Sequence, residues 1–269
     1  MGRIGRSFQL VGQSYRILMQ DKELMVLPLI SGMFILIVVA AMSAGFGLSA
    51  SHLQQRGPAL YIPLFLFYVV TYAIGIFFQA AIVAGATERM RGGDPTIGSA
   101  LGAAAHRFWP IVMWAVVAAT VGMVIRAIHD RVGFVGRIIT GLLGVAWSLA
   151  TFFIVPVLVL EDRSIPDSFR RSVSVFRDTW GETVVGGTTL GAATLCAWLT
   201  LIAITGLLAM AIGVAALAVF FSGAVVLMVF FSALQGVYVA SLYRFAAGHG
   251  ATGGLDPSLL RQAFVPKDR

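Results

Sequence analysis

The chain has 269 residues, of which 58% are hydrophobic and 12% are charged, and its formal net charge is +7. Soluble domains carry about twice that share of charged residues, so the composition excludes an ordinary soluble protein and predicts an all-α integral membrane protein. Because the basic residues are spread over short segments between apolar runs, they favour a membrane surface as partner and no nucleic acid. The single cysteine, Cys196, lies within an apolar run, so no intrachain disulfide is expected.

The chain opens with one amphipathic segment and two long apolar runs. Apolar residues recur every three or four positions over residues 4–20, which predicts an interfacial helix. Residues 24–48 and 60–86 are each long enough to cross a hydrocarbon layer of about 30 Å. We expect the first run to be retained as a span, because no convincing cleavage context accompanies it.

A second interfacial helix is predicted over residues 95–108, with Asp94 as its N-cap and Pro95 in its first turn. Apolar runs over residues 109–125 and 138–160 follow it, with a basic loop between them. Both runs have the length of a membrane span.

A third interfacial helix is predicted over residues 165–180, where Ser164 and Asp167 form a capping box. Its apolar face comprises Ile165, Phe169, Val173, Phe176 and Trp180. The opposite face comprises Arg170, Arg171, Ser174, Arg177 and Asp178. This pattern predicts a helix that lies on the membrane with its cationic side toward headgroups or cytoplasm.

The last apolar run, residues 183–243, contains no ionisable side chain besides Cys196 and two tyrosines. It is long enough for two spans, expected at about 183–206 and 215–243, with a turn near 206–214. Residues 1–247 are thus predicted to form one six-span membrane domain, and residues 248–269 a cytoplasmic tail.

The distribution of Lys and Arg predicts the orientation of the spans. With six spans, fifteen of these residues fall on the side of the termini and four on the other. Because positive residues concentrate on the cytoplasmic side, both termini are expected to be cytoplasmic in a multi-pass protein of the bacterial inner membrane.

Two of the interfacial helices have a matching pair of residues. Pro95 and Trp109 have the same spacing as Pro166 and Trp180, and the two pairs are related by a period of about 71 residues. The match predicts three parallel units, each an interfacial helix followed by two spans. The alternative is chance, because short cytoplasmic loops of membrane proteins are often amphipathic and basic.

The sequence shows no pattern typical of catalysis. No Asp, Glu, Lys, Arg or His falls in the middle of a predicted span, where such residues mark proton relays and ion sites. We therefore expect no catalytic residue, no cofactor and no metal site. Gln79 and Gln235 are polar residues at membrane depth, and they either bond to each other or line a pore.

Short motifs give the chain a resemblance to known families. Glu161-Asp162-Arg163-Ser164, Ser168-Phe169-Arg170-Arg171-Ser172 and Trp180 are similar to a loop of proteins related to the glycerophosphoryl diester phosphodiesterase membrane domain. The whole chain, from Ser14-Tyr15-Arg16 and Asp21-Lys22-Glu23-Leu24 onward, resembles an uncharacterised actinobacterial family of polytopic membrane proteins, DUF6159. That family implies a membrane fold but no activity, and the phosphodiesterase's catalytic domain has no counterpart here.

The expected function is that of a non-enzymatic membrane scaffold that binds anionic lipid, or a protein partner or second copy, through a basic cytoplasmic collar. The residues expected at that surface are Arg16, Arg107, Trp109, Arg170, Arg171, Arg177 and Trp180. The alternative is a permease or channel subunit with Gln79 and Gln235 in its pore.

Overall fold

The computed structural model describes residues 3–46 and 61–247. The predicted tail, residues 248–269, lies outside the described residues. The helices are α1 (Arg3–Gln20), η1 (Lys22–Met25), α2 (Val26–Phe46), α4 (Tyr61–Met90), α5 (Ile97–His106), α6 (Phe108–His129), α7 (Phe134–Ala150), α8 (Ile154–Leu160), α9 (Ile165–Ile212), η3 (Gly213–Ala215) and α10 (Ala216–Ala246). The two described ranges contain helices and no strand, which confirms the predicted all-α class.

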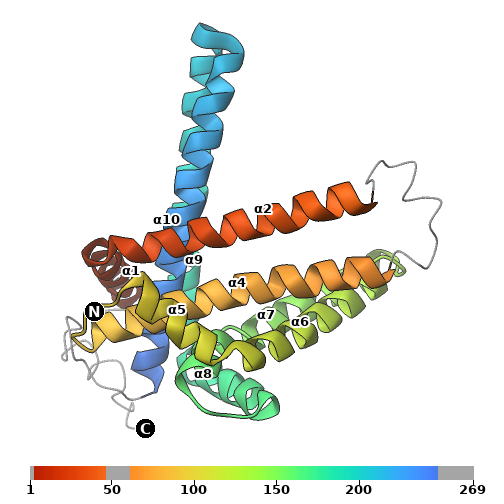
Figure 1. The fold of residues 1–269 in the computed structure, drawn as a ribbon, viewed down its shortest axis with the longest axis vertical. Coiled ribbons are helices and arrows are strands. Elements are labelled where there is room, and N and C mark those ends of the chain that lie inside the picture. The colour runs from red at the N-terminus through yellow and green to blue at the C-terminus, as the bar shows by residue number, and fades with distance from the viewer. Residues whose placement is uncertain (1–2, 47–60, 248–269) are drawn as a thin grey trace.

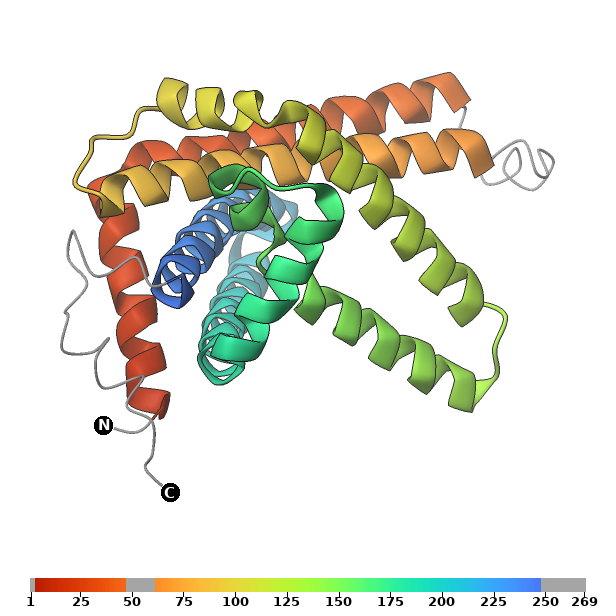
Figure 2. The ribbon, with the colours of Figure 1, turned by 90° about the horizontal axis from the view of Figure 1, so that it is seen from below.

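Three helical hairpins extend from a common region and diverge from one another (Figure 1). The hairpins pair α2 with α4, α6 with α7, and α9 with α10. The α9–α10 hairpin runs across the direction of α2 and α4. The view from below shows α6 and α7 leaving the same region in a third direction (Figure 2). We call this region the base: it holds α1, α5, α8, the start of α9 and the C-terminal ends of α4 and α10.

Five segments of the described chain are long and apolar enough to cross a membrane. They are Lys22–Gly45, Ile62–Met90, Phe108–His129, Phe134–Leu160 and Thr183–Ala246. The last one contains the hairpin turn Gly213–Ala215, at the end of the range predicted for it. Gly213 has φ +57°, a left-handed conformation that glycine adopts without a steric cost. The segments are consistent with the predicted membrane protein.

Each hairpin is preceded by a helix at the base, and the backbone leaves the helical conformation between the two. The breaks fall at Asp21 (φ −122°, ψ 72°), Arg107 (φ −105°, ψ 22°) and Thr179 (φ −121°, ψ 17°). The third break lies within α9, so the predicted helix over residues 165–180 and the span that follows it form one long, kinked helix.

The predicted span over residues 138–160 is not one continuous helix. α7 ends at Ala150, and α8 begins at Ile154 after a turn. Pro156 explains the break, because it has no N–H to donate and its ring would clash with the carbonyl of residue 152 in an uninterrupted helix. Ser172 on α9 closes the turn: its hydroxyl donates to the Ala150 carbonyl (2.7 Å) and accepts from the Phe153 N–H (3.2 Å).

We expect Ser172→Ala to lower the free energy of unfolding by about 1–3 kcal/mol, because it leaves a buried N–H and a partly buried carbonyl of the backbone without a partner. Thermal unfolding of the purified protein in detergent measures the loss. Ser174→Ala is the matched control, since Ser174 lies on the same helix but is exposed. Equal midpoints for the two variants would contradict this role of Ser172.

The predicted N-caps have different outcomes. Ser164 caps α9 as predicted, with its hydroxyl accepting from the Asp167 N–H. The prediction of Asp94 as the cap of the second helix is wrong: Thr96 and Ser99 form a capping box at the start of α5. Asp94 instead accepts from Arg89 (2.8 Å), because the nearby guanidinium offers the carboxylate an opposite charge.

The first part of α9 packs against the protein through small buried residues as well as through part of the predicted apolar face. Its buried positions are Ser168, Ser172, Val175 and Thr179, whereas Trp180 is exposed. Phe169 stacks on Trp114 and Trp147, with ring centroids 6.3 and 5.7 Å away, and so joins α6, α7 and α9. Small side chains face the core here because they let helix backbones approach closely.

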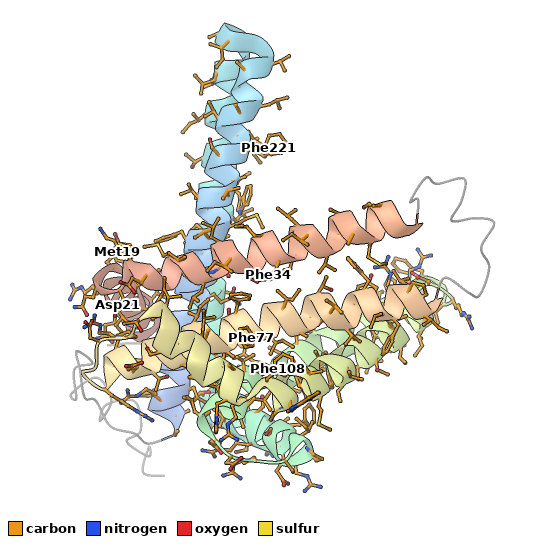
Figure 3. The ribbon with its side chains drawn as sticks, viewed as in Figure 1. Met19, Asp21, Phe34, Phe77, Phe108 and Phe221 are labelled. Atoms are coloured by element: carbon orange, nitrogen blue, oxygen red, sulfur yellow. The ribbon has the colours of Figure 1, made fainter. Side chains whose placement is uncertain are left out.

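The buried core lies at the base, and the far parts of the hairpins are apolar and exposed. Leu18, Leu24, Ile82, Phe153 and Tyr238 are among the fully buried side chains. By contrast Phe221, on the part of the α9–α10 hairpin that extends beyond the other helices, is 64% exposed (Figure 3). Exposed apolar helix surfaces of this kind suit contact with acyl chains.

Candidate functional site at the base of the hairpins

A buried acid fixes the start of the first hairpin to its end. Asp21 precedes α2 and is 6% exposed, and both of its carboxylate oxygens accept from the guanidinium of Arg89, near the end of α4. The same guanidinium reaches Asp94. A bidentate pair of this kind is geometrically specific, so it orients α1 and α2 relative to α4.

Glu161 joins the second hairpin to the third. It follows α8 directly, and its carboxylate accepts from Arg163, from Arg171 on α9 (3.1 Å) and from the Tyr243 hydroxyl on α10. Burial by itself would raise the pKa of Glu161, but these three hydrogen bonds outweigh it and hold the pKa below its ordinary value. The same contact holds the pKa of Arg171 above its ordinary value, although burial opposes this. Glu161 is therefore ionised at neutral pH.

The neighbouring residue on α10 completes the connection to the first hairpin. Arg244 is 6% exposed, and its guanidinium donates to the Thr87 carbonyl near the end of α4 (3.1 Å). Tyr243 and Arg244 thus contact the ends of the other two hairpins from consecutive positions. The ends of α4, α8 and α10 therefore meet through hydrogen bonds at the base.

The residues predicted for a lipid or partner surface fall into two groups. Arg107 pairs with Asp162, and Arg171 pairs with Glu161, so both contribute to the internal connections of the base. Arg16 and Arg177 are exposed, and the exposed Arg170 contacts only Asp167, at 3.4 Å, among the ion pairs of the described residues. Trp109 and Trp180 are 72% and 58% exposed. Each follows one of the backbone breaks, where a membrane segment begins.

The two glutamines lie in different places. Gln79 lines a groove between α2, α4 and α10 with a volume of about 600 Å³. Gln235 lines another, of about 480 Å³, between α9 and α10. The two grooves share no lining residue, and no hydrogen bond joins the glutamines within the described residues. The structure therefore does not bring them together in one pore.

The sequence analysis did not single out Glu161, Tyr243 or Ser172 as residues that join elements. The charged run that begins at Glu161 is visible in the sequence, but nothing there connects it with Tyr243, which stands 82 positions later. Within the described residues, no group of three His, Cys, Asp or Glu side chains is placed to hold a metal ion.

The described residues form helices, with five segments long and apolar enough to cross a membrane, as in the class of polytopic membrane proteins. The chain belongs to a family of unknown function, DUF6159, whose family model matches residues 58–254. This confirms the resemblance to an uncharacterised family. No curated protein and no solved structure matches the chain, and the similarity to the phosphodiesterase membrane domain stays an expectation from the sequence.

Proposed function

We propose that the chain is a non-enzymatic scaffold of the bacterial inner membrane that binds anionic lipid headgroups at its base. The observation that carries the proposal is the group of exposed cations and tryptophans left after the internal ion pairs are formed. Arg16, Arg170 and Arg177 are exposed, and Trp109 and Trp180 lie at the start of membrane segments. Tryptophan favours the headgroup level of a bilayer, and each nearby Arg contributes on the order of 1 kcal/mol of attraction to an anionic surface.

In this proposal the three hairpins cross the membrane six times, since the segment Thr183–Ala246 turns back at Gly213. The base then lies on the cytoplasmic side with both termini, because it carries most of the Lys and Arg residues. The helix, break and hairpin that recur three times support a parallel repeat of three units. A protein partner or a second copy at the same surface is the competing occupant.

The triple variant Arg16→Gln, Arg170→Gln, Arg177→Gln tests the proposal. In nanodiscs that mix phosphatidylcholine with phosphatidylglycerol, we expect it to retain roughly a hundredfold less phosphatidylglycerol than the unaltered protein, because three surface cations are lost. Native mass spectrometry of the released protein counts the retained lipids.

The matched control is Arg126→Gln, Arg131→Gln, Arg137→Gln, which removes three exposed cations at the far end of the α6–α7 hairpin. This control should retain phosphatidylglycerol at the unaltered level. Unchanged retention in the first variant would refute the proposal, and an equal loss in both would show that net charge alone governs lipid retention. Co-purification of a second copy or another protein that depends on the base arginines, with unchanged lipid, would favour the competing occupant.

A further inference from the structure

The groove between α2, α4 and α10 carries one polar side chain from each of its three helices. Its walls are otherwise apolar, and its polar members are Ser31, Gln79 and Ser232. The Gln79 amide lies against α10 beside Gly236, where a Cβ atom would stand 3.1 Å from Nε2. Ser232 is one turn earlier on α10, so it is on the same face as Gly236. The polar groups of α4 and α10 therefore meet along one side of the groove.

These three side chains have no hydrogen-bond partner among the described residues. Many other serine and threonine hydroxyls of the spans donate to a carbonyl one turn earlier on their own helix, as in Ser43, Thr71, Thr120, Ser148 and Ser222. Ser31 is 9% exposed, Gln79 is half-buried and Ser232 is exposed, and all three line the groove. A polar group without a partner is costly where no water is present, so a ligand that supplies the missing bonds would be favoured.

The three polar groups lie at similar distances from the base. Counted at 1.5 Å per residue along each helix from the end of its apolar segment at the base, Ser31, Gln79 and Ser232 are roughly 13 to 21 Å away from that end. Each therefore lies well inside an apolar segment, and a ligand at this place must be soluble in the acyl-chain region.

We propose that the groove binds a neutral lipid, with a carbonyl or hydroxyl group of the lipid hydrogen-bonded to Ser31, Gln79 and Ser232. The ligand is uncharged because no ionisable side chain is among the described residues that line the groove. Hydroxyls and an amide suit carbonyl and hydroxyl groups, since they both donate and accept. Diacylglycerols and isoprenoid quinones share this chemistry. The proposal rests on the membrane class of the protein and uses none of the exposed arginines.

The groove around Gln235 lacks this arrangement. Its Thr194 hydroxyl already donates to the Leu190 carbonyl (2.8 Å), and it is built from α9, α10 and Phe152. It therefore provides a control site of similar size and with the same amide side chain.

Two variants test the inference. Gly75 lines the groove, and a Cβ atom there would meet nothing within 4 Å, so Gly75→Leu should fill the space without disturbing the helices. Gln79→Leu removes the amide. The matched controls are Gly141→Leu, a glycine on α7 that also faces open space, and Gln235→Leu in the other groove.

Each protein is placed in phosphatidylcholine nanodiscs that contain a minor fraction of either dioleoylglycerol or ubiquinone-10, and native mass spectrometry reads the lipid that stays bound. We expect the unaltered protein and both controls to retain one of these lipids, and the two groove variants to retain roughly tenfold less. Which of the two lipids is retained shows whether the groove prefers a diacylglycerol or an isoprenoid quinone. Equal retention in all five proteins, or retention of phosphatidylcholine alone, would overturn the proposal. The triple arginine variant at the base tests anionic lipid binding and leaves the groove unchanged. Either proposal can therefore be refuted while the other stands.

Discussion

Replacement of Glu161 by leucine is expected to lower the free energy of unfolding by about 3 kcal/mol, the largest effect of any single change at the base. The carboxylate is the shared acceptor for Arg163, Arg171 and Tyr243, so its removal deprives the buried Tyr243 hydroxyl and the partly buried Arg171 of their acceptor. Breaking a buried ion pair by removing one member typically costs this much. Thermal or denaturant unfolding in detergent measures it.

Asp178→Leu is the control, because Asp178 is an exposed acid on the same helix, α9. This substitution should change the free energy of unfolding by no more than about 0.5 kcal/mol, as is usual for exposed positions. A similar loss in both variants would show that the contact of Glu161 with Tyr243 and Arg171 contributes nothing specific.

The difference between the unaltered protein and Glu161→Leu should also depend on pH. The pKa of Glu161 is lower in the folded protein than its ordinary value near 4.5, so the unfolded chain binds this proton more readily. The stabilisation by Glu161 is then complete above pH 4.5, and it is lost as the pH falls through the folded pKa. A pH series on the two proteins should show their midpoints converge in acid. If the two unfolding midpoints instead differed by the same amount at neutral and at acidic pH, the ionised Glu161 carboxylate would not be the source of the stabilisation.

Gly186→Ala should have the second large effect, about 1–3 kcal/mol of destabilisation, because it overfills the contact between α9 and α10. A Cβ atom at this position would lie 2.0 Å from the Tyr238 hydroxyl oxygen. Tyr238 is 1% exposed and belongs to the core, so moving its ring away disturbs the packing around it.

Gly187 provides the matched control, since a Cβ atom there would meet nothing within 4 Å. Gly187→Ala should be neutral or stabilise the protein by up to about 1 kcal/mol, because alanine has the higher helix propensity. The unfolding midpoints of the Gly186→Ala and Gly187→Ala proteins are compared, and only the Gly186→Ala midpoint should fall. A stable Gly186→Ala protein would mean that α9 and α10 do not pack as closely as the structure shows.

The predicted apolar face of residues 165–180 shows what hydrophobic periodicity leaves out. The pattern ranks positions by polarity, and it assigned Ile165, Phe169 and Trp180 to the side that faces acyl chains. Ile165 and Phe169 instead pack, half-buried, against Trp114, and the buried positions are Ser168, Ser172 and Thr179, which are small enough for close helix packing. The size of a side chain and the partners of its hydroxyl decided this face, and neither can be read from periodicity.

The sequence by itself determined the membrane class, the helical content, most of the apolar segments and the Ser164 cap, because length, hydropathy and capping chemistry act over a few neighbouring residues. Only the tertiary structure decided that Glu161 meets Tyr243, that Arg107 and Arg171 are used internally, and that Gln79 and Gln235 line separate grooves. These contacts join residues that stand far apart along the chain. They depend on how three diverging hairpins meet at one base, a geometry that no local pattern encodes.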